Sequence, residues 1–387
     1  MIIKMVIKTK LQPWEIDAIA NISATKLANL EDNLWTKLID YLYEQAVENK
    51  LEKNDDLDWQ QQMLNQQSLF SQRISKEIYK IMNGVIADFK QKLQDGGVIN
   101  LAAEEEWLRS QFNKKALPKK PKTSLKDSKA INKTVSKHVE NDSKYLAMGK
   151  RNLKTNTEMT LKNLIHTTIS EYRNGGKGMT TDKAIYRASR KAAQKGIPML
   201  IDRAGKHWDP EVYTRLVISN ALSQVSNESE LARFQEYGGK LVRVSSHAAC
   251  RPTHRPYQDN IYCFSGSTEN YKNLREATNY GTAGGLCGIN CRHYLIPYIP
   301  DAGEFKRPET IDETENARQY KLTQQQRYLE RKVRAAKRQQ YSAKKFGDEM
   351  DQNQANQRVR TAQANVRSFV KENNLTRQYQ REQIGKK

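Results

Sequence analysis

Residues 245–262 read SSHAACRPTHRPYQDNIY, and residues 280–300 read YGTAGGLCGINCRHYLIPYIP. Between residues 247 and 293 lie all four cysteines and three of the six histidines of the 387-residue chain. Alternating apolar and polar residues in and around these stretches are typical of short strands. The strands are predicted at 240–246, 260–264 and 293–299. We therefore expect a small β-rich or irregular Cys/His module at about 240–300.

Long helices are predicted on the N-terminal side of this module. Leu34, Leu38, Tyr41 and Leu42 recur at the spacing of one helix face. A second stripe runs from Ile74 to Phe89, and Asp95-Gly96-Gly97 is expected to end it, because glycine favours helix C-terminal caps.

The region nearest the module is predicted to contain a helix at 181–196 that ends at Gly196, a short hairpin at 201–208 and a helix at 212–235. The predicted class is thus α+β and mostly α-helical, with the small module flanked by long helices.

Changes in composition divide the chain into five predicted segments. They are an N-terminal helical region at 1–113, a basic linker or arm at 114–154, a helical block at 155–239, the Cys/His module at 240–303 and a basic helical tail at 304–387.

The formal net charge is +21, and 37% of the residues are hydrophobic, below the roughly 45–50% of typical globular domains. Residues 318–387 alone hold 18 basic and 6 acidic residues. Such a charge favours a polyanionic partner, and nucleic acid is the commonest one. The alternative is a charge that serves solubility only. The residues predicted to contact phosphates are Lys119, Lys120, Lys122, Arg331, Lys332, Arg334, Lys337 and Arg338.

No apolar run approaches the ~18–20 residues of a membrane span, so no membrane partner is expected. Four cysteines in a long chain favour free thiols or metal ligands over a disulfide scaffold.

The Cys/His pattern has the chemistry of a zinc site, which needs four soft or borderline ligands in a tetrahedron. Cys287, Cys291 and His293 form a glycine-rich knuckle, and His254 adds a fourth ligand from about forty residues earlier. Cys250 or His247 could replace one of these ligands. The alternative is that the cysteines are small buried thiols and the histidines hydrogen bond to structural turns.

A catalytic role is an alternative hypothesis for the same stretch. His247, Arg251, His254 and Arg292 could serve as acid, base and phosphate clamps of a metal-independent nuclease. No carboxylate is placed in the sequence to orient a histidine, and no phosphate-binding glycine loop is present. We therefore assign no catalytic residue.

The module resembles the phage minor capsid protein 2 family, which is related to the Mu F-like head morphogenesis proteins. The matching residues are Val244–His247, Arg251–His254, Gln258, Ile261-Tyr262, Leu274-Arg275, Tyr280–Thr282, Gly285–Gly288, Asn290–His293, Pro297 and Ile299-Pro300. The resemblance extends over most of the chain from about residue 145. One departure is Asp259, which stands where the family has a glycine; a tight glycine turn is lost there, although Asp also tolerates left-handed backbone.

The resemblance implies a non-enzymatic, structural protein of a tailed-phage or prophage head, with the portal and/or the major capsid protein as partners. It implies a location inside the phage head after assembly in the host cytoplasm, beside packaged double-stranded DNA. Contact with that DNA would be through phosphates and independent of sequence. His247, Arg251, Pro252, Gln258, Asn290 and Arg292 would be structural motif residues. The second hypothesis is a phage-delivered nuclease or toxin-like effector that uses the cluster at 247–293.

Overall fold

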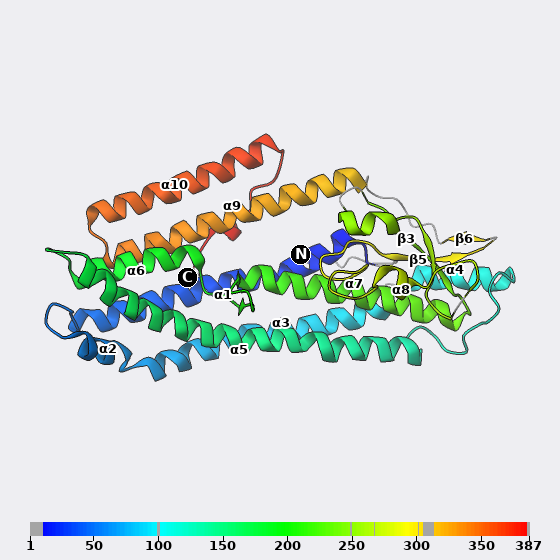
Figure 1. Ribbon diagram of the computed structural model, residues 1–387, viewed down its shortest axis with the longest axis horizontal. Coiled ribbons are helices and arrows are strands. Elements are labelled where there is room, and N and C mark those ends of the chain that lie inside the picture. Colours follow the sequence, from blue (N-terminus) through cyan, green and yellow to red (C-terminus); the bar gives the residue numbers. More distant parts are fainter. Residues whose placement is uncertain are drawn as a thin grey trace. The chain divides into compact units, whose positions relative to one another are not determined.

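The computed structural model describes residues 11–98, 101–247, 250–266, 268–300, 302–304 and 313–384. It is 70% helical with small antiparallel sheets, which confirms the predicted mostly helical α+β class. Figure 1 shows long helices and a small strand-containing region. Within the described ranges, no helix is long and apolar enough to span a membrane.

The helices and strands follow one another along the chain in a simple order. The α-helices are α1 (Pro13–Glu48), α2 (Asp56–Leu64), α3 (Gln67–Val98), α4 (Ala102–Asn113), α5 (Lys129–Asn174), α6 (Thr181–Lys195), α7 (Pro210–Glu236), α8 (Leu274–Thr278), α9 (Glu313–Phe346) and α10 (Glu349–Glu372). The strands are β1 (Leu200–Ile201), β2 (His207–Trp208), β3 (Leu241–Val244), β4 (Ile261–Cys263), β5 (Leu295–Ile299) and β6 (Gly303–Glu304), and 3-10 turns occur at η2 (Pro252–Tyr257) and η3 (Tyr379–Glu382).

Two compact units are each assembled from three separate stretches of sequence. Unit 1 comprises residues 1–22, 85–146 and 215–319, and unit 2 comprises residues 23–84, 147–214 and 320–387. The five segments predicted from composition are continuous stretches, whereas each unit combines stretches from several of them.

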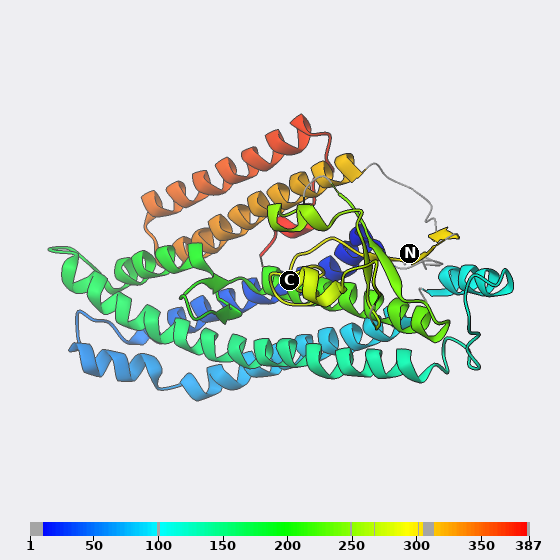
Figure 2. The ribbon, with the colours of Figure 1, turned by 45° about the vertical axis from the view of Figure 1, so that its right-hand side comes forward.

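Unit 2 is a helical assembly built on the predicted apolar stripes. Leu34, Leu38 and Leu42 of α1 are fully buried, as a one-sided stripe requires. Helix α10 runs antiparallel to α9 (Figures 1 and 2), and the two pack through Val333, Val366 and other apolar residues. The predicted basic tail is therefore helical, and one side of it is part of a packed core.

The helix at 181–196 and the hairpin at 201–208 are confirmed within unit 2. Helix α6 ends at Gly196, whose φ of +69° is a conformation that glycine adopts without strain. Strands β1 and β2 pair antiparallel, with Leu200 opposite Trp208.

Unit 1 contains the predicted strand-rich module. Its sheet has the order β4-β3-β5-β6 with antiparallel neighbours, which confirms the three predicted strands. Val242, Val244 and Leu295 of this sheet pack with Leu231 of α7 and Leu286 in one apolar cluster. The sheet thereby holds the loop that carries Cys287 and Cys291.

Helix α3 ends at Val98, one residue after the predicted stop at Asp95-Gly96-Gly97, but neither glycine has the positive φ of a C-terminal cap. A Cβ atom on Gly97 would lie 2.3 Å from a methyl carbon of Val135 and 3.1 Å from the Ser229 hydroxyl. These neighbours belong to α5 and α7, so the glycine allows close helix packing in place of a cap.

The expected basic arm at 114–154 is irregular only over residues 114–128, which we call the basic loop; from Lys129 onward it is part of α5. The basic loop holds six lysines and one aspartate, and all six lysines are exposed. It is fixed to the end of α7. The Lys119 amide donates to the carbonyl of Tyr237 at 3.2 Å, and Leu117 is buried beside Phe234.

Candidate metal centre

The loop between α8 and β5 forms a tight knuckle over residues 284–293. Cys287 and Asn290 adopt φ values of +56° and +57°, so the chain turns sharply on either side of Gly288. A Cβ atom on Gly285 or Gly288 would lie 1.9 Å from a backbone carbonyl oxygen. Only glycine fits at these two positions. The knuckle therefore brings Cys291 and His293 toward the 3-10 turn η2, which carries His254.

Three of the predicted ligands meet at one point. The donor atoms of His254, Cys291 and His293 all lie within 4.8 Å of one another. The Cys291 Sγ atom is 3.6 Å from Nδ1 of His254 and 3.3 Å from Nδ1 of His293. Both histidines are 1% exposed, and the Cys291 side chain is half-buried.

Hydrogen bonds on the far side of each imidazole fix its orientation. Nε2 of His254 lies 3.0 Å from the carbonyl oxygen of Gly284. Nε2 of His293 lies 3.1 Å from Oε1 of Gln258, and the backbone N–H of His247 donates to that same Oε1 at 2.7 Å. Both partners are acceptors, so in the neutral form of each ring Nε2 carries the proton and Nδ1 presents a lone pair to Cys291.

Cys287 and His247 lie next to this group. The Cys287 amide donates to Cys291 Sγ at 3.2 Å, and the Cys287 thiol donates to the carbonyl of His293 at 3.3 Å. The imidazole of His247 packs on that of His293, with ring centroids 4.4 Å apart. Within the described residues, Nε2 of His247 is buried without a hydrogen-bond partner.

The environment changes the acidity of two of these groups. A hydrogen bond with Cys287 is the main cause that lowers the pKa of Cys291 to about 3; burial opposes it, and His293 adds to it. Burial is the main cause that lowers the pKa of His247 to about 4, and the neighbouring His293 contributes. The cluster therefore favours a thiolate at Cys291 and a neutral imidazole at His247.

The motif residues around the cluster have structural contacts. Arg251 donates to the carbonyl of Ile289, and Arg292 donates to Asp17 of α1 at 3.0 Å. Pro252 begins η2. His254, which the nuclease hypothesis uses as an acid or base, is 1% exposed.

The departure at Asp259 leaves the turn intact. Asp259 has a φ of +59°, and its amide donates to the carbonyl of Val244 at 3.0 Å. Arg243 donates to the Asp259 carboxylate at 2.5 Å. Aspartate thus adopts the left-handed conformation that glycine would take in the family.

Cys250 is half-buried and Cys263 is buried, and both are free thiols. The Cys263 thiol donates to the carbonyl of Ser265 at 3.3 Å. Cys250 and Cys263 lie outside the group of converging donors formed by His254, Cys291 and His293.

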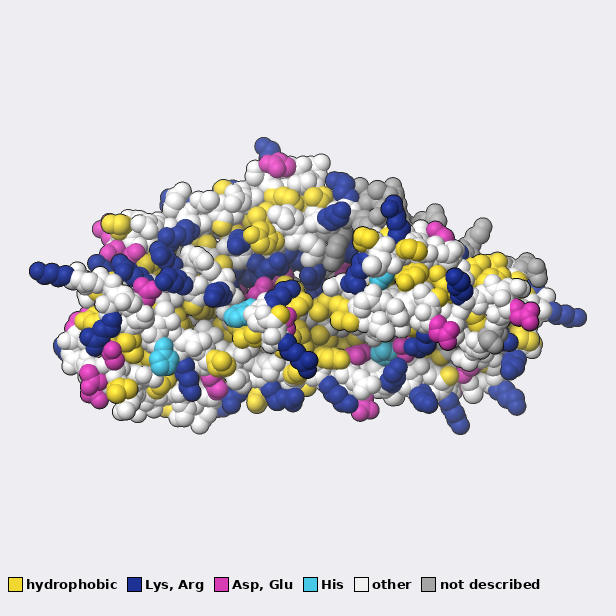
Figure 3. All heavy atoms as spheres, viewed as in Figure 1, with side chains coloured by type: hydrophobic (Ala, Val, Ile, Leu, Met, Phe, Trp, Pro, Cys, Tyr) yellow, Lys and Arg dark blue, Asp and Glu magenta, His cyan; other side chains and the backbone are white. Residues whose placement is uncertain are grey.

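The predicted phosphate-binding residues differ in their exposure. Lys119, Lys120 and Lys122 of the basic loop are exposed, as is Lys332. Lys337 is half-buried and donates to Gln383 at 2.7 Å, and Arg331 lies 3.8 Å from Asp209. In the view of Figure 3, many Lys and Arg side chains stand out on the surface, with fewer Asp and Glu side chains between them.

Arg334 and Arg338 correct the phosphate-binding prediction, because both are buried in ion pairs. Arg338 lies 2.5 Å from Asp32 and 3.3 Å from Glu31. Arg334 lies 3.1 Å from Asp32 and 2.7 Å from Glu211. Their guanidinium groups neutralise carboxylates of α1 and α7, so they are not available to DNA.

Sequence reasoning missed these buried carboxylates, because Glu31, Asp32 and Glu211 carry no motif. Burial is the main cause that raises the pKa of Glu31 to about 7, against the opposing effect of Arg338. Unit 1 also holds a buried ionisable side chain with a shifted pKa, His138. Burial lowers its pKa, but hydrogen bonds to Asp142 and Glu228 outweigh burial and raise it to about 9.

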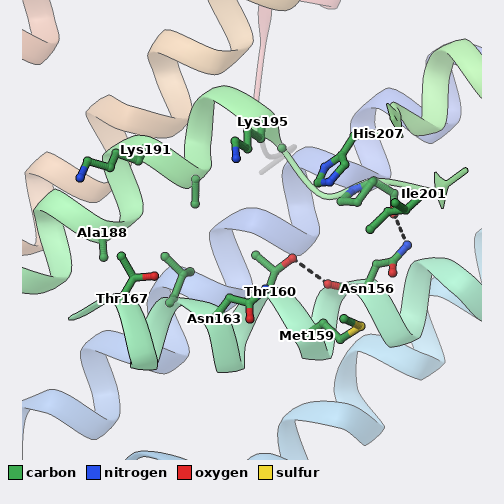
Figure 4. Close-up of a pocket in the computed structure, with 14 residues that line it drawn as sticks. Asn156, Met159, Thr160, Asn163, Thr167, Ala188, Lys191, Lys195, Ile201 and His207 are labelled. Carbon is green, nitrogen blue, oxygen red and sulfur yellow. Dashed lines mark hydrogen bonds between the residues drawn. The ribbon is translucent and has the colours of Figure 1, made fainter. Parts of the chain in front are cut away.

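Unit 2 also has a pocket of about 330 Å³ between α5 and α6 (Figure 4). Asn156, Thr160 and Asn163 line one side and Lys191 and Lys195 the other. Both lysines are exposed, and Lys191 lies 2.6 Å from a carboxylate oxygen of Glu171. We assign this pocket no ligand.

Comparison with known proteins decides the family. The family model for phage minor capsid protein 2 matches residues 24–371. The chain belongs to the phage minor capsid protein 2 family. It is also 33% identical over 209 residues to a protein named "Structural protein" of Lactococcus phage LL-H, covering 52% of this chain and 56% of that protein. A "Structural protein" of Lactococcus phage mv4 is 40% identical over 106 residues, covering 27% of this chain and 85% of that protein.

The aligned region spans little more than half of the LL-H protein. No solved structure matches the chain. The family membership confirms the resemblance read from the residues of the Cys/His module.

Proposed function

We propose that this chain is a structural component of a tailed-phage or prophage head. It lies inside the head near the portal, and it contacts packaged double-stranded DNA without sequence preference. Family membership carries the first part of the proposal, since the match extends over residues 24–371. The curated relatives are named as structural proteins of phages, which is consistent with assembly in the host cytoplasm and a final location in the virion.

The basic loop supports the contact with DNA. Its six lysines are exposed, while its backbone is tied to α7 by the bond from Lys119 to Tyr237 and by a bond from Arg233 to the carbonyl of Thr123 at 3.1 Å. A fixed backbone presents the ammonium groups together, so little ordering is needed when phosphates are neutralised.

Helix α10 adds a second basic surface within unit 2. Arg360, Arg367 and Lys371 are exposed and spaced at i, i+7 and i+11, which places them along one helix face. These residues replace Arg334 and Arg338 as the phosphate-contacting candidates of the tail. Deleting the tail would break buried ion pairs, so point substitutions are the better test.

Salt-dependent DNA binding tests the contact. Changing Lys119, Lys120 and Lys122 together to Gln should lower the slope of log K against log salt by about 2–3, since each phosphate contact on B-DNA contributes about 0.9. The control changes the exposed lysines at 76, 80 and 90 to Gln, which removes the same charge from α3. An equal loss of slope in the control would contradict a contact through the basic loop.

Cross-linking mass spectrometry on intact particles tests the location. Lysine-reactive cross-links from this chain to the portal are expected. Links only to tail proteins, or labelling of its lysines by a reagent that cannot enter the head, would contradict an internal, portal-proximal position.

A further inference from the structure

We propose that Cys287, Cys291, His254 and His293 form a closed, structural zinc site that joins the knuckle at 284–293 to η2. This inference is independent of the proposed function, because it concerns the purified chain and requires no partner. Two observations carry it: the distances between the donor atoms and the hydrogen bonds on the far side of each imidazole.

The distances fit a tetrahedral ion. With Zn–S of about 2.3 Å and Zn–N of about 2.0–2.1 Å, a sulfur and a nitrogen ligand lie about 3.5 Å apart. The Cys291 Sγ atom lies 3.3 Å from Nδ1 of His293 and 3.6 Å from Nδ1 of His254. Both sulfur–nitrogen distances therefore match those expected around a tetrahedral ion.

Because of the far-side hydrogen bonds, His254, His293 and Cys291 hold too few protons to hydrogen bond fully with one another. Both Nε2 atoms carry a proton for Gly284 and Gln258, so the two Nδ1 atoms are lone pairs directed at one sulfur. A thiol at Cys291 could donate to only one of them, and a thiolate could donate to neither. Both histidines are 1% exposed, and a buried acceptor without a donor is costly. A metal ion would bind both lone pairs and the thiolate at once.

The far-side contacts are those that orient metal-binding histidines. Such histidines commonly donate the second ring N–H to a carbonyl or another acceptor, which fixes the tautomer and the ring plane. Gly284 and Gln258 fill this role for His254 and His293. The position of Gln258 is itself fixed, because its Oε1 atom also accepts the backbone N–H of His247.

Cys287 is the fourth ligand that we assign. Its amide donates to Cys291 Sγ and its thiol donates to the carbonyl of His293, so loss of the thiol proton on metal binding would free the Cys287 sulfur to turn toward the ion. Four protein ligands leave no open position for water or substrate, which is the arrangement of a structural zinc site.

Metal content of the purified chain tests the proposal. Elemental analysis after expression with zinc should give about one zinc per chain. Cobalt added to metal-free protein should give the visible bands of a tetrahedral ion with thiolate charge transfer. Cys291→Ser should lose the zinc and the bands. Cys263→Ser is the matched control, since Cys263 is a buried free cysteine of β4 in unit 1, and it should keep both.

Chelation tests the site in the wild-type chain, so its result does not depend on whether Cys291→Ser folds. Removing zinc from the wild-type chain should lower its melting temperature, and zinc, but not magnesium, should restore it. Wild-type protein with well under one zinc per chain and no tetrahedral cobalt spectrum would overturn the site. A Cys287→Ser variant with full zinc and an unchanged cobalt spectrum would overturn the assignment of the fourth ligand.

Discussion

Replacing Arg338 by Met should destabilise unit 2 strongly. The substitution keeps an unbranched side chain and removes the guanidinium, which is within 2.5 Å of Asp32 and 3.3 Å of Glu31 and donates to the carbonyl of Ala193 at 3.1 Å. Asp32 and Glu31 are 0% and 3% exposed. Breaking a buried ion pair by removing one partner costs about 3–5 kcal/mol, and we expect a loss of unfolding free energy in that range near neutral pH.

The loss should depend on pH. Burial raises the pKa of Glu31 to about 7 and also raises that of Asp32, so without Arg338 these carboxyl groups can take up protons when the pH falls. The destabilisation should therefore be smaller at pH 5 than at pH 8, where an uncompensated buried charge remains.

Urea unfolding followed by tryptophan fluorescence measures this effect. The indole of Trp35 donates to the backbone carbonyl of Arg338 at 3.4 Å, which makes Trp35 a local probe. The control is Arg173→Met, because Arg173 pairs with Asp56 at 2.7 Å at the surface and such pairs contribute about 0–1 kcal/mol. Equal, small losses for both variants would refute the reasoning.

Three further predictions concern stability. Gly97→Ala should destabilise the protein by about 1–3 kcal/mol in urea, because the added methyl would lie 2.3 Å from Val135. Gly84→Ala in the same helix has open space and should stabilise the protein by about 0.5–1 kcal/mol; a stabilising Gly97→Ala or a destabilising Gly84→Ala would contradict the packing argument. The pKa of His138 is raised from 6.5 to about 9, so its stabilising effect is complete below pH 6.5 and is lost as the pH rises through 9. In urea titrations, the wild-type unfolding free energy should therefore fall between these pH values, and His138→Gln should not show this fall; an unchanged pH profile in the variant would contradict the stabilising role of charged His138. Asn290 has a φ of +57°, so Asn290→Ala should lower thermal stability by about 1 kcal/mol and Asn290→Gly should be nearly neutral; a harmless alanine would argue against the left-handed turn.

Local patterns predicted most of the elements. The stripe of Leu34, Leu38 and Leu42, the strands of the module and the helix that ends at Gly196 all follow from periodicity and capping, which act over a few residues. The class and the family could be predicted because the knuckle residues combine glycines, cysteines and histidines in a specific order.

Contacts between distant residues could not be predicted from the sequence. Gly97 looks like a helix cap until Val135 and Ser229 are found against it. Arg334 and Arg338 look like exposed basic residues until α9 is packed beside the carboxylates of α1 and α7. Sequence spacing suggested the zinc ligands, but only the structure shows that His254, Cys291 and His293 converge and that Gln258 orients one of the rings.

The most direct test of the central claim is quantitative mass spectrometry of purified, nuclease-treated particles from the phage or induced prophage that encodes this chain. As a structural head component, the chain should be present at a constant, low copy number relative to the portal and the major capsid protein, in DNA-filled heads. Its absence from mature particles, while the portal and capsid proteins are recovered, would contradict the account.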